Sequence, residues 1–320
     1  GHEYQIKKVR AAGADNIFCV MSGSFVQSGM PAFCDKSLRA KCAVTGGADA
    51  VIELPAVYAT ASAQLFAEGA LKIISDIKNI EYMAMGATAP AEEIFKLAEI
   101  KTVHADKFNS VLREYLDSGK SYNAASASAF CNLYDKLYTN DISVEQILCD
   151  PNNILCIEYV CAIYNHAAKI EPLVINRVGR SYNDDEPNGD YVSATAIRRA
   201  ESVGNLEEVK KYIPFCFDDM RDWRKAHSPN TEALNSLYVY ALKHAEPQNI
   251  SRLRNCSEGM EYLLKNLSFN HDFNAIIDSA IGRRYGKKRL HRLFLDLLLN
   301  IDKSAVGKRF VTRLLACRSG

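Results

Sequence analysis

Three consecutive segments near the start of the chain decide its fold: NIFCVMSG at residues 16–23, DKSLRAKCAVTGG at 35–47 and ADAVIELP at 48–55. The first and third are short apolar runs, which are typical of strands buried on both faces of a parallel sheet. The middle segment has helical spacing, with Asp35 as a candidate N-cap and Gly46 as a stop. This order predicts a βαβ unit in an open, mostly parallel sheet with helices on both faces.

The same alternation continues along the chain. A helix is predicted at 60–76 and a strand at 80–86, residues 91–170 are mostly helical, and a last strand is predicted at 171–178. The chain opens on a helical pattern, whereas a doubly wound sheet ordinarily starts with a strand. We therefore expect a first strand upstream of residue 1.

From about residue 204 the strand pattern disappears, and every apolar segment carries helical spacing. We predict two domains, an α/β domain at 1–203 and an all-helical domain at 204–320. Their charges differ, because residues 1–200 contain 19 basic and 24 acidic side chains, whereas 201–320 contain 20 basic and 14 acidic ones. A basic second domain favours a polyanionic partner.

Composition limits the class of protein further. The chain has 320 residues, 48% of them apolar, and no apolar run reaches the length of a membrane span, so we expect a cytoplasmic protein without a membrane partner. None of the 10 cysteines forms a C-x-x-C pair, and most lie in apolar runs. We expect buried thiols, with neither a metal site nor a disulfide framework.

Small and polar residues gather where strands should end. Gly23 and Gly86 follow predicted strands, and Arg177 lies at the end of another. The segment YVSATAIRRA at 191–200 then begins a helix with Ser193 and Thr195 and places Arg198 one turn later. Helix amides, hydroxyls and a guanidinium group suit phosphate oxygens. Taken in isolation, the pattern is better explained by an ordinary N-cap with solvated arginines.

Taken together, these patterns resemble the HxGH nucleotidylyltransferase superfamily, with Gly1 and His2 as the last two positions of the first motif. The longer blocks at 20–55, 150–163, 176–184, 191–200 and 283–299 are similar to the bacterial tRNA(Met) cytidine acetate ligases. The resemblance covers nearly the whole chain.

The resemblance implies an activity. Members of this family use ATP with Mg²⁺ to activate acetate as acetyl-adenylate, and transfer the acetyl group to N4 of the wobble cytidine of elongator tRNA(Met). It also implies two catalytic contacts, His2 and Arg198. The implied ATP-binding residues are Gly1, His2, Gly86, Asn152, Asn153, Arg177, Ser193, Thr195 and Arg198.

Two further groups of basic residues are candidates for anion binding. Lys36 and Arg39 follow the glycine-rich loop and are equally explained as a solvated helix face. A run without acidic residues near the C-terminus would contact tRNA phosphates, although an ordinary charged helix end has the same pattern. It comprises Arg283, Arg284, Lys287, Lys288, Arg289 and Arg292.

The chain also departs from the family pattern. It reads QSGMPA at 27–32 where the family usually has QRGEPA, and MGAT at 85–88 in place of FGSE, which removes a carboxylate. Two alternatives therefore stay open: an adenylyltransferase acting on a small phosphorylated molecule, and an RNA-binding relative that has lost catalysis.

Overall fold

The computed structural model describes residues 1–138, 142–166, 169–177, 194–213, 215–227, 230–257, 259–282 and 285–318. Helix α1 (His2–Ala11) precedes β1 (Phe18–Ser22), α2 (Lys36–Thr45) and β2 (Ala50–Leu54). β1 and β2 pair in parallel, from Phe18 opposite Ala50 to Ser22 opposite Leu54, which confirms the predicted βαβ unit. The carboxylate of Asp35 caps α2 by accepting a hydrogen bond from the amide of Ser37.

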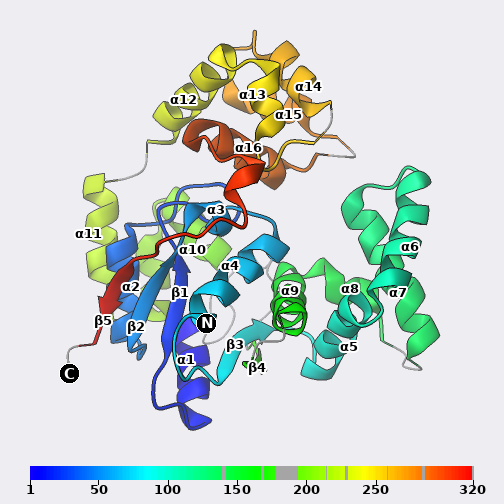
Figure 1. Cartoon of the computed structure of the whole chain (residues 1–320). Coiled ribbons are helices and arrows are strands. Elements are labelled where there is room, and N and C mark those ends of the chain that lie inside the picture. The colour runs from blue at the N-terminus through cyan, green and yellow to red at the C-terminus, as the bar shows by residue number, and fades with distance from the viewer. Residues whose placement is uncertain are drawn as a thin grey trace.

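A second parallel pair lies beside the first sheet (Figure 1). β3 (Tyr82–Ala87) and β4 (Glu171–Asn176) run in register, and the intervening chain is helical, as predicted. The helices before and between these strands are α3 (Ala56–Ala59), α4 (Ala63–Ser75), α5 (Ala91–Thr102), α6 (Ala105–Asp117), α7 (Tyr122–Leu137), α8 (Val144–Cys149) and α9 (Pro151–Asn165).

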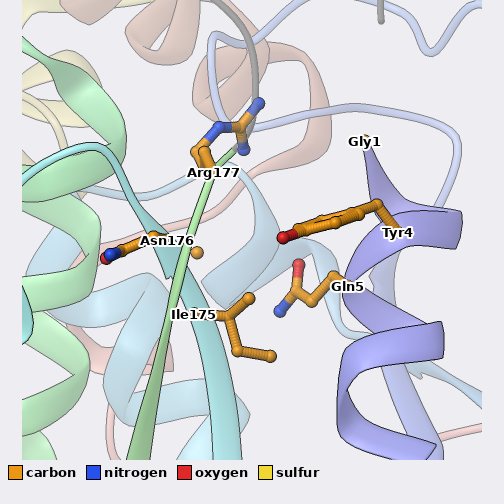
Figure 2. A pocket seen from close by; sticks show the side chains of 7 residues that line it. Gly1, Tyr4, Gln5, Ile175, Asn176 and Arg177 are labelled. Atoms are coloured by element: carbon orange, nitrogen blue, oxygen red, sulfur yellow. The ribbon is translucent and has the colours of Figure 1, made fainter. Parts of the chain in front are cut away.

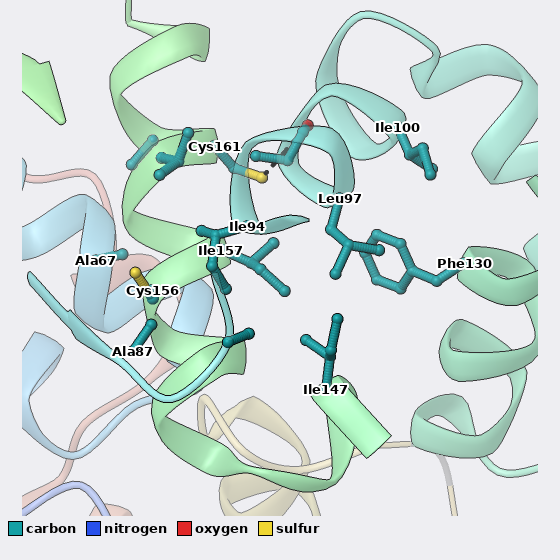
Figure 3. Close-up of a cluster of buried hydrophobic side chains, with 14 of the residues drawn as sticks. Ala67, Ala87, Ile94, Leu97, Ile100, Phe130, Ile147, Cys156, Ile157 and Cys161 are labelled. Atoms are coloured by element: carbon teal, nitrogen blue, oxygen red, sulfur yellow. Dashed lines mark hydrogen bonds between the residues drawn. The ribbon is translucent and has the colours of Figure 1, made fainter. Parts of the chain in front are cut away.

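The largest core gathers around α9 (Figure 3). Cys156, Ile157 and Cys161 of this helix are buried against Ile94 and Leu97 of α5 and against side chains of α4, α7 and α8. α9 contacts α4, α5 and both strands of the second sheet. Seven residues of α9 are buried, which places this helix at the centre of the core.

The C-terminal part contains helices on a second core. After α10 (Ala194–Ser202), a 3₁₀ turn (Leu206–Tyr212) and α11 (Phe217–His227), side chains of the following five helices form this core around Phe273 and Phe294. These helices are α12 (Thr231–His244), α13 (Pro247–Arg252), α14 (Met260–Leu267), α15 (Phe273–Ala280) and α16 (Lys287–Leu299).

Two sequence-based predictions are corrected: the second part is not entirely helical, and the cysteines are not all thiols. After a short 3₁₀ turn (Lys303–Ala305), β5 (Leu314–Cys317) returns to the first sheet and pairs antiparallel with β2. Four residues are too few to show a period, so this strand left no clear signal. In addition, Cys42 of α2 and Cys216 form a disulfide with a Cα–Cα distance of 5.8 Å, contrary to the expectation of thiols alone.

The helical part is joined to the sheet by polar contacts. Arg254 donates hydrogen bonds to the carbonyls of Val57 and Thr60 at the end of α3 and pairs with the buried carboxylate of Asp296 on α16. Gly29, in the loop after β1, lies so close to α16 that a Cβ there would stand 2.7 Å from the backbone nitrogen of Arg292. Within the described residues no helix is both long and apolar enough to cross a bilayer.

Candidate nucleotide site

A small, open hollow lies where α1 begins and the second sheet ends. Gly1, Tyr4 and Gln5 line it from α1 and Gly86 from β3, and the end of β4 adds Ile175, Asn176 and Arg177. Figure 2 shows the Tyr4 ring and the Gln5 amide extending from α1 toward the strand that carries Ile175 and Asn176. Three residues predicted from separate motifs, Gly1, Gly86 and Arg177, are thereby brought together.

Gln5, one of the residues that line the cavity, fixes α1 to the second sheet. The side-chain amide of Gln5 donates a hydrogen bond of 3.2 Å to the carbonyl of Ala84 on β3. Tyr4 and Gln5 were not predicted as site residues, although they follow Gly1 by three and four positions. That spacing places them on the same helix face as Gly1 and was the signal available in the sequence.

Gly86 keeps the cavity open. A Cβ at this position would stand 3.3 Å from Cγ of Arg177 and 3.6 Å from Oε1 of Gln5. The Arg177 amide donates to the carbonyl of Ala87 at 2.8 Å, which continues the pairing of the two strands and fixes the start of the arginine side chain. A side chain larger than glycine would therefore occupy space between α1 and Arg177.

The electrostatics of the cavity favour an anion. Desolvation, and after it the positive charges of the chain's amino group and of Arg177, lower the pKa of His2, which does not itself line the cavity. The neutral imidazole still has one N–H to donate. The first-turn amides of α1 and the guanidinium of Arg177 add positive potential at the same place.

Asn152 and Asn153 lie at the start of α9, and the structure distinguishes their environments. Asn153 is buried, and its Oδ1 accepts hydrogen bonds from the amides of Thr88 (2.8 Å) and Ala89 (3.1 Å), just beyond β3. Asn152 is half-buried and donates from its side chain to Asp150. Asn153 thus shapes the turn that follows Gly86.

The structure describes only part of the predicted phosphate-binding group, which consists of Ser193, Thr195 and Arg198. Ser193 lies outside the described residues, as do Arg283 and Arg284 of the basic run. The backbone of Thr195 belongs to α10, and its side chain is outside the described set. Arg198 and Arg199 are exposed on α10, whose Glu201 pairs with Arg224 of α11.

Lys36 and Arg39 lie on α2, after the loop that follows β1, and both are engaged in contacts within the protein. Nζ of Lys36 lies 2.8 Å from Oε1 of Glu53, at the end of β2. The guanidinium of Arg39 donates to the carbonyls of Ser22, Gly23 and Cys34. Both cations therefore already have protein partners that hold the glycine-rich loop in shape.

The basic helix α16 begins with three cations. Lys287 and Lys288 are exposed, whereas Arg289 is half-buried and donates to the carbonyl of Asn255 at 3.1 Å. Arg292 is also half-buried, and its Nε approaches Oδ1 of Asn255 at 3.3 Å. Its position against the loop at Gly29 makes it part of the joint between the two regions of the chain.

The chain matches known proteins along almost its whole length. A family model described as HIGH Nucleotidyl Transferase matches residues 1–319, so the chain belongs to the HIGH nucleotidyl transferases. It is 31% identical to the tRNA(Met) cytidine acetate ligase of Clostridium perfringens over 97% of this chain and 78% of that protein. It is 33% identical to the protein of the same name from Acetivibrio thermocellus, over 94% and 74%. Within the HIGH class it thus belongs to the tRNA(Met) cytidine acetate ligase family, a family of ligases.

Solved structures agree with this assignment. The apo crystal structure of Thermotoga maritima TmcAL has a TM-score of 0.85 at 26% identity, covering 95% of this chain and 73% of that one. A second crystal structure of the same protein, bound with alpha-thio ATP, has a TM-score of 0.82 at 25% identity with the same coverage. The likeness confirms the predicted α/β nucleotidyltransferase fold.

Proposed function

We propose that this protein is an ATP-dependent acetate ligase that forms N4-acetylcytidine at the wobble position of elongator tRNA(Met) in the cytoplasm. The observation that carries the proposal is the cavity that unites Gly1, Gly86 and Arg177, residues up to 176 positions apart in the sequence. Relatives named as tRNA(Met) cytidine acetate ligases and a similar structure bound with an ATP analogue support it.

The first chemical step would be adenylylation of acetate. A carboxylate oxygen of acetate attacks the α-phosphorus of ATP, and the bond from this phosphorus to the bridging oxygen of pyrophosphate breaks. The products are acetyl-adenylate and pyrophosphate. Because negative charge develops on the phosphoryl oxygens, catalysis depends mainly on positioning and charge stabilisation.

The residues of this chain can supply both the positioning and the charge stabilisation that this step needs. The start of α1 and the N–H of His2 would donate to phosphoryl oxygens, and Arg177 would hold the nucleotide against the open face above Gly86. Ser193, Thr195 and Arg198 of the α10 region would hold the β- and γ-phosphates. No protein nucleophile is needed for this chemistry.

Mg²⁺ would enter with the nucleotide. Across the part of the chain that the structure describes, no group of three or more His, Cys, Asp or Glu residues could hold a metal ion. The triphosphate oxygens are therefore the ligands we expect for the ion, which would offset charge on the departing pyrophosphate.

The second step transfers the acetyl group to RNA. The N4 amine of the cytidine attacks the acetyl carbonyl carbon, AMP leaves with the electrons of the broken C–O bond, and the amine loses a proton. The base must leave the anticodon stack to reach the cavity, which is easier in a loop than in a duplex.

The electrostatics of α16 favour a polyanion. Lys287, Lys288 and Arg289 occupy the first turn of the helix, which contains no acidic residue and has Gly286 as its N-cap. Cations repel the positive end of the helix dipole, so this arrangement is unfavourable in the free protein. Phosphates of tRNA would relieve that repulsion, and we propose that this end of α16 contacts RNA together with Arg283, Arg284 and Arg292.

The decisive experiment is nucleoside analysis of tRNA(Met) after incubation with the protein, acetate and ATP, combined with a pyrophosphate assay. We expect N4-acetylcytidine only when all components are present. RNA binding without pyrophosphate release would identify a relative that has lost catalysis. Pyrophosphate release that requires a small phosphoester in place of acetate would identify an adenylyltransferase.

Variants test the cavity separately from turnover. We expect Arg177→Ala to weaken AMP-PNP binding strongly in calorimetry, because it removes a cation from the cavity wall. Lys7→Ala removes a cation of α1 that does not line the cavity and should leave affinity unchanged. Arg198→Ala should weaken binding more than Arg199→Ala, its exposed neighbour on α10. Equal affinities within either pair would remove the corresponding contact from the proposal.

A further inference from the structure

The turn that follows β3 is held by polar side chains from the start of α9 that the proposed reaction does not use. Oγ1 of Thr88 lies 2.8 Å from Oδ2 of Asp150 and 3.0 Å from Oδ1 of Asn153. Asp150 and Asn153 are buried, whereas Thr88 is exposed. The hydroxyl of an exposed threonine is thus held by acceptor oxygens of two buried side chains.

The other hydrogen bonds of this network show which of its atoms donate and which accept. Oδ1 of Asp150 accepts from the backbone amide of Asn152 at 2.8 Å and so caps α9. Oδ1 of Asn153 accepts from the backbone amides of Thr88 and Ala89, which identifies it as the oxygen of that side chain. Since both neighbours of the hydroxyl are acceptors, its single proton points into the protein. The lone pairs of this oxygen can then only accept a hydrogen bond, which a ligand could donate.

The hydroxyl stands close to the cavity. Thr88, the first residue after β3, does not line the cavity but follows Gly86 by two positions, which corresponds to about 7 Å of extended chain. Gly86 lines the cavity opposite Arg177. A ligand that lay over Gly86 with its phosphates toward Arg177 and extended past the end of β3 would have its next group near Oγ1 of Thr88. In a nucleotide, the group next to the α-phosphate is the ribose.

We propose that Thr88 is a specificity-determining residue whose Oγ1 accepts a hydrogen bond from a ribose hydroxyl of the nucleotide, and that Asp150 and Asn153 are positioning residues for it. This assignment rests on the proposed ATP site and names its sugar contact. The buried carboxylate strengthens the acceptor, because a hydroxyl that donates to an anion becomes a better acceptor itself.

The test compares nucleotides that differ by one hydroxyl. Affinities of ATP, 2′-deoxy-ATP and 3′-deoxy-ATP are measured by calorimetry for the wild type, Thr88→Val and Thr88→Ser. We expect the wild type to bind one deoxy analogue about fivefold more weakly than ATP, the ordinary effect of one lost hydrogen bond. Thr88→Val, which keeps the shape and lacks the hydroxyl, should bind both alike, and Thr88→Ser should restore the preference.

Asp150→Asn tests the positioning role. An amide in place of the carboxylate can donate to Oγ1. We therefore expect the ratio of the affinities for ATP and for the deoxy analogue to fall toward one, while α9 stays capped. A purely structural role would lower both affinities and leave their ratio unchanged. The ratio is measured within each variant, so partial loss of folded protein does not affect it.

The outcomes separate this inference from the proposed function. ATP binding with equal affinity for all three nucleotides in the wild type, or with an unchanged preference in Thr88→Val, would overturn the ribose contact and leave the ATP site standing. A wild type that binds none of the three nucleotides would overturn the ATP site and the ribose contact together.

Discussion

The ion pair between Asp296 and Arg254 predicts how stability depends on pH at the joint between α16 and α3. Asp296 is fully buried and accepts hydrogen bonds from Arg254 and from the backbone and side chain of Asn255. Removing both charges from water costs several kcal/mol per ion, which pairing only partly recovers. Burial therefore raises the pKa of Asp296 to about 6, despite the adjacent guanidinium, and lowers the pKa of Arg254.

The sign of the effect follows from linkage. The carboxyl titrates near 3.8 in the unfolded chain and near 6 in the folded one, so the native state holds this proton more firmly. The resulting stabilisation is full below pH 4 and is lost as the pH rises through 6. Two pKa units correspond to about 3 kcal/mol. Relative to Asp296→Asn, which cannot titrate, the wild type should lose up to this much between pH 4 and pH 7.

Urea unfolding of both proteins at pH 4, 5.5 and 7 measures this difference. Titration of ¹³C-labelled aspartate by NMR, with Asp296→Asn to assign the resonance, measures the pKa directly. Asp302→Asn is a control of opposite sign, because the hydrogen bond from Ser304 lowers the pKa of Asp302. If the wild type instead gained stability over Asp296→Asn as the pH rose, attraction to Arg254 would outweigh desolvation and the reasoning would be refuted.

Three further predictions concern other contacts. Gly29→Ala should destabilise the protein by about 2–4 kcal/mol in urea unfolding, because the φ of Gly29 is +83° and the new Cβ would meet the backbone of α16. Gly119→Ala, at φ +88° with open space around it, should cost only the conformational part, about 1–2 kcal/mol. Equal costs for the two variants would argue against the α16 contact. The disulfide joins residues with a sequence separation of 174, so a reductant should lower the free energy of unfolding of the wild type by up to about 5 kcal/mol. The reductant should leave the stability of Cys42→Ser unchanged. A wild type whose stability does not respond to the reductant would contradict the disulfide. Replacing Lys287 and Lys288 with Ala should reduce the slope of log affinity for tRNA against log salt by about 1–2, and an unchanged slope would place RNA elsewhere.

Much of the sheet could be predicted because its signals are local. The apolar runs at β1 and β2 and the capping residue Asp35 lie within one βαβ unit, and the structure has them where the pattern indicates. Gly86 and Arg177 could be placed near each other for a similar reason, since parallel strands bring their carboxyl ends to one edge. β5 could not be predicted, because four residues at the end of a helical region carry no period of their own.

The polar networks could not be predicted, because their residues act through partners far along the chain. One oxygen of Asp150 caps α9, and its second oxygen binds a hydroxyl 62 residues away. Asn153 appears available to a ligand from its position in a motif, whereas the fold commits its oxygen to the amides of Thr88 and Ala89. A local pattern reveals the chemical type of a side chain, and only the tertiary structure shows which lone pair or proton is still accessible.

The same network bears on the altered MGAT segment. Position 88 lacks the carboxylate that the resemblance leads one to expect, but Asp150 places a carboxylate oxygen 2.8 Å from the hydroxyl at that position. A carboxylate oxygen thus lies behind the hydroxyl, and the side chain at position 88 is itself a neutral hydrogen-bonding group instead of an anion. A nucleotide carries several negative charges, so a neutral acceptor near its ribose repels the phosphates less than an exposed carboxylate would.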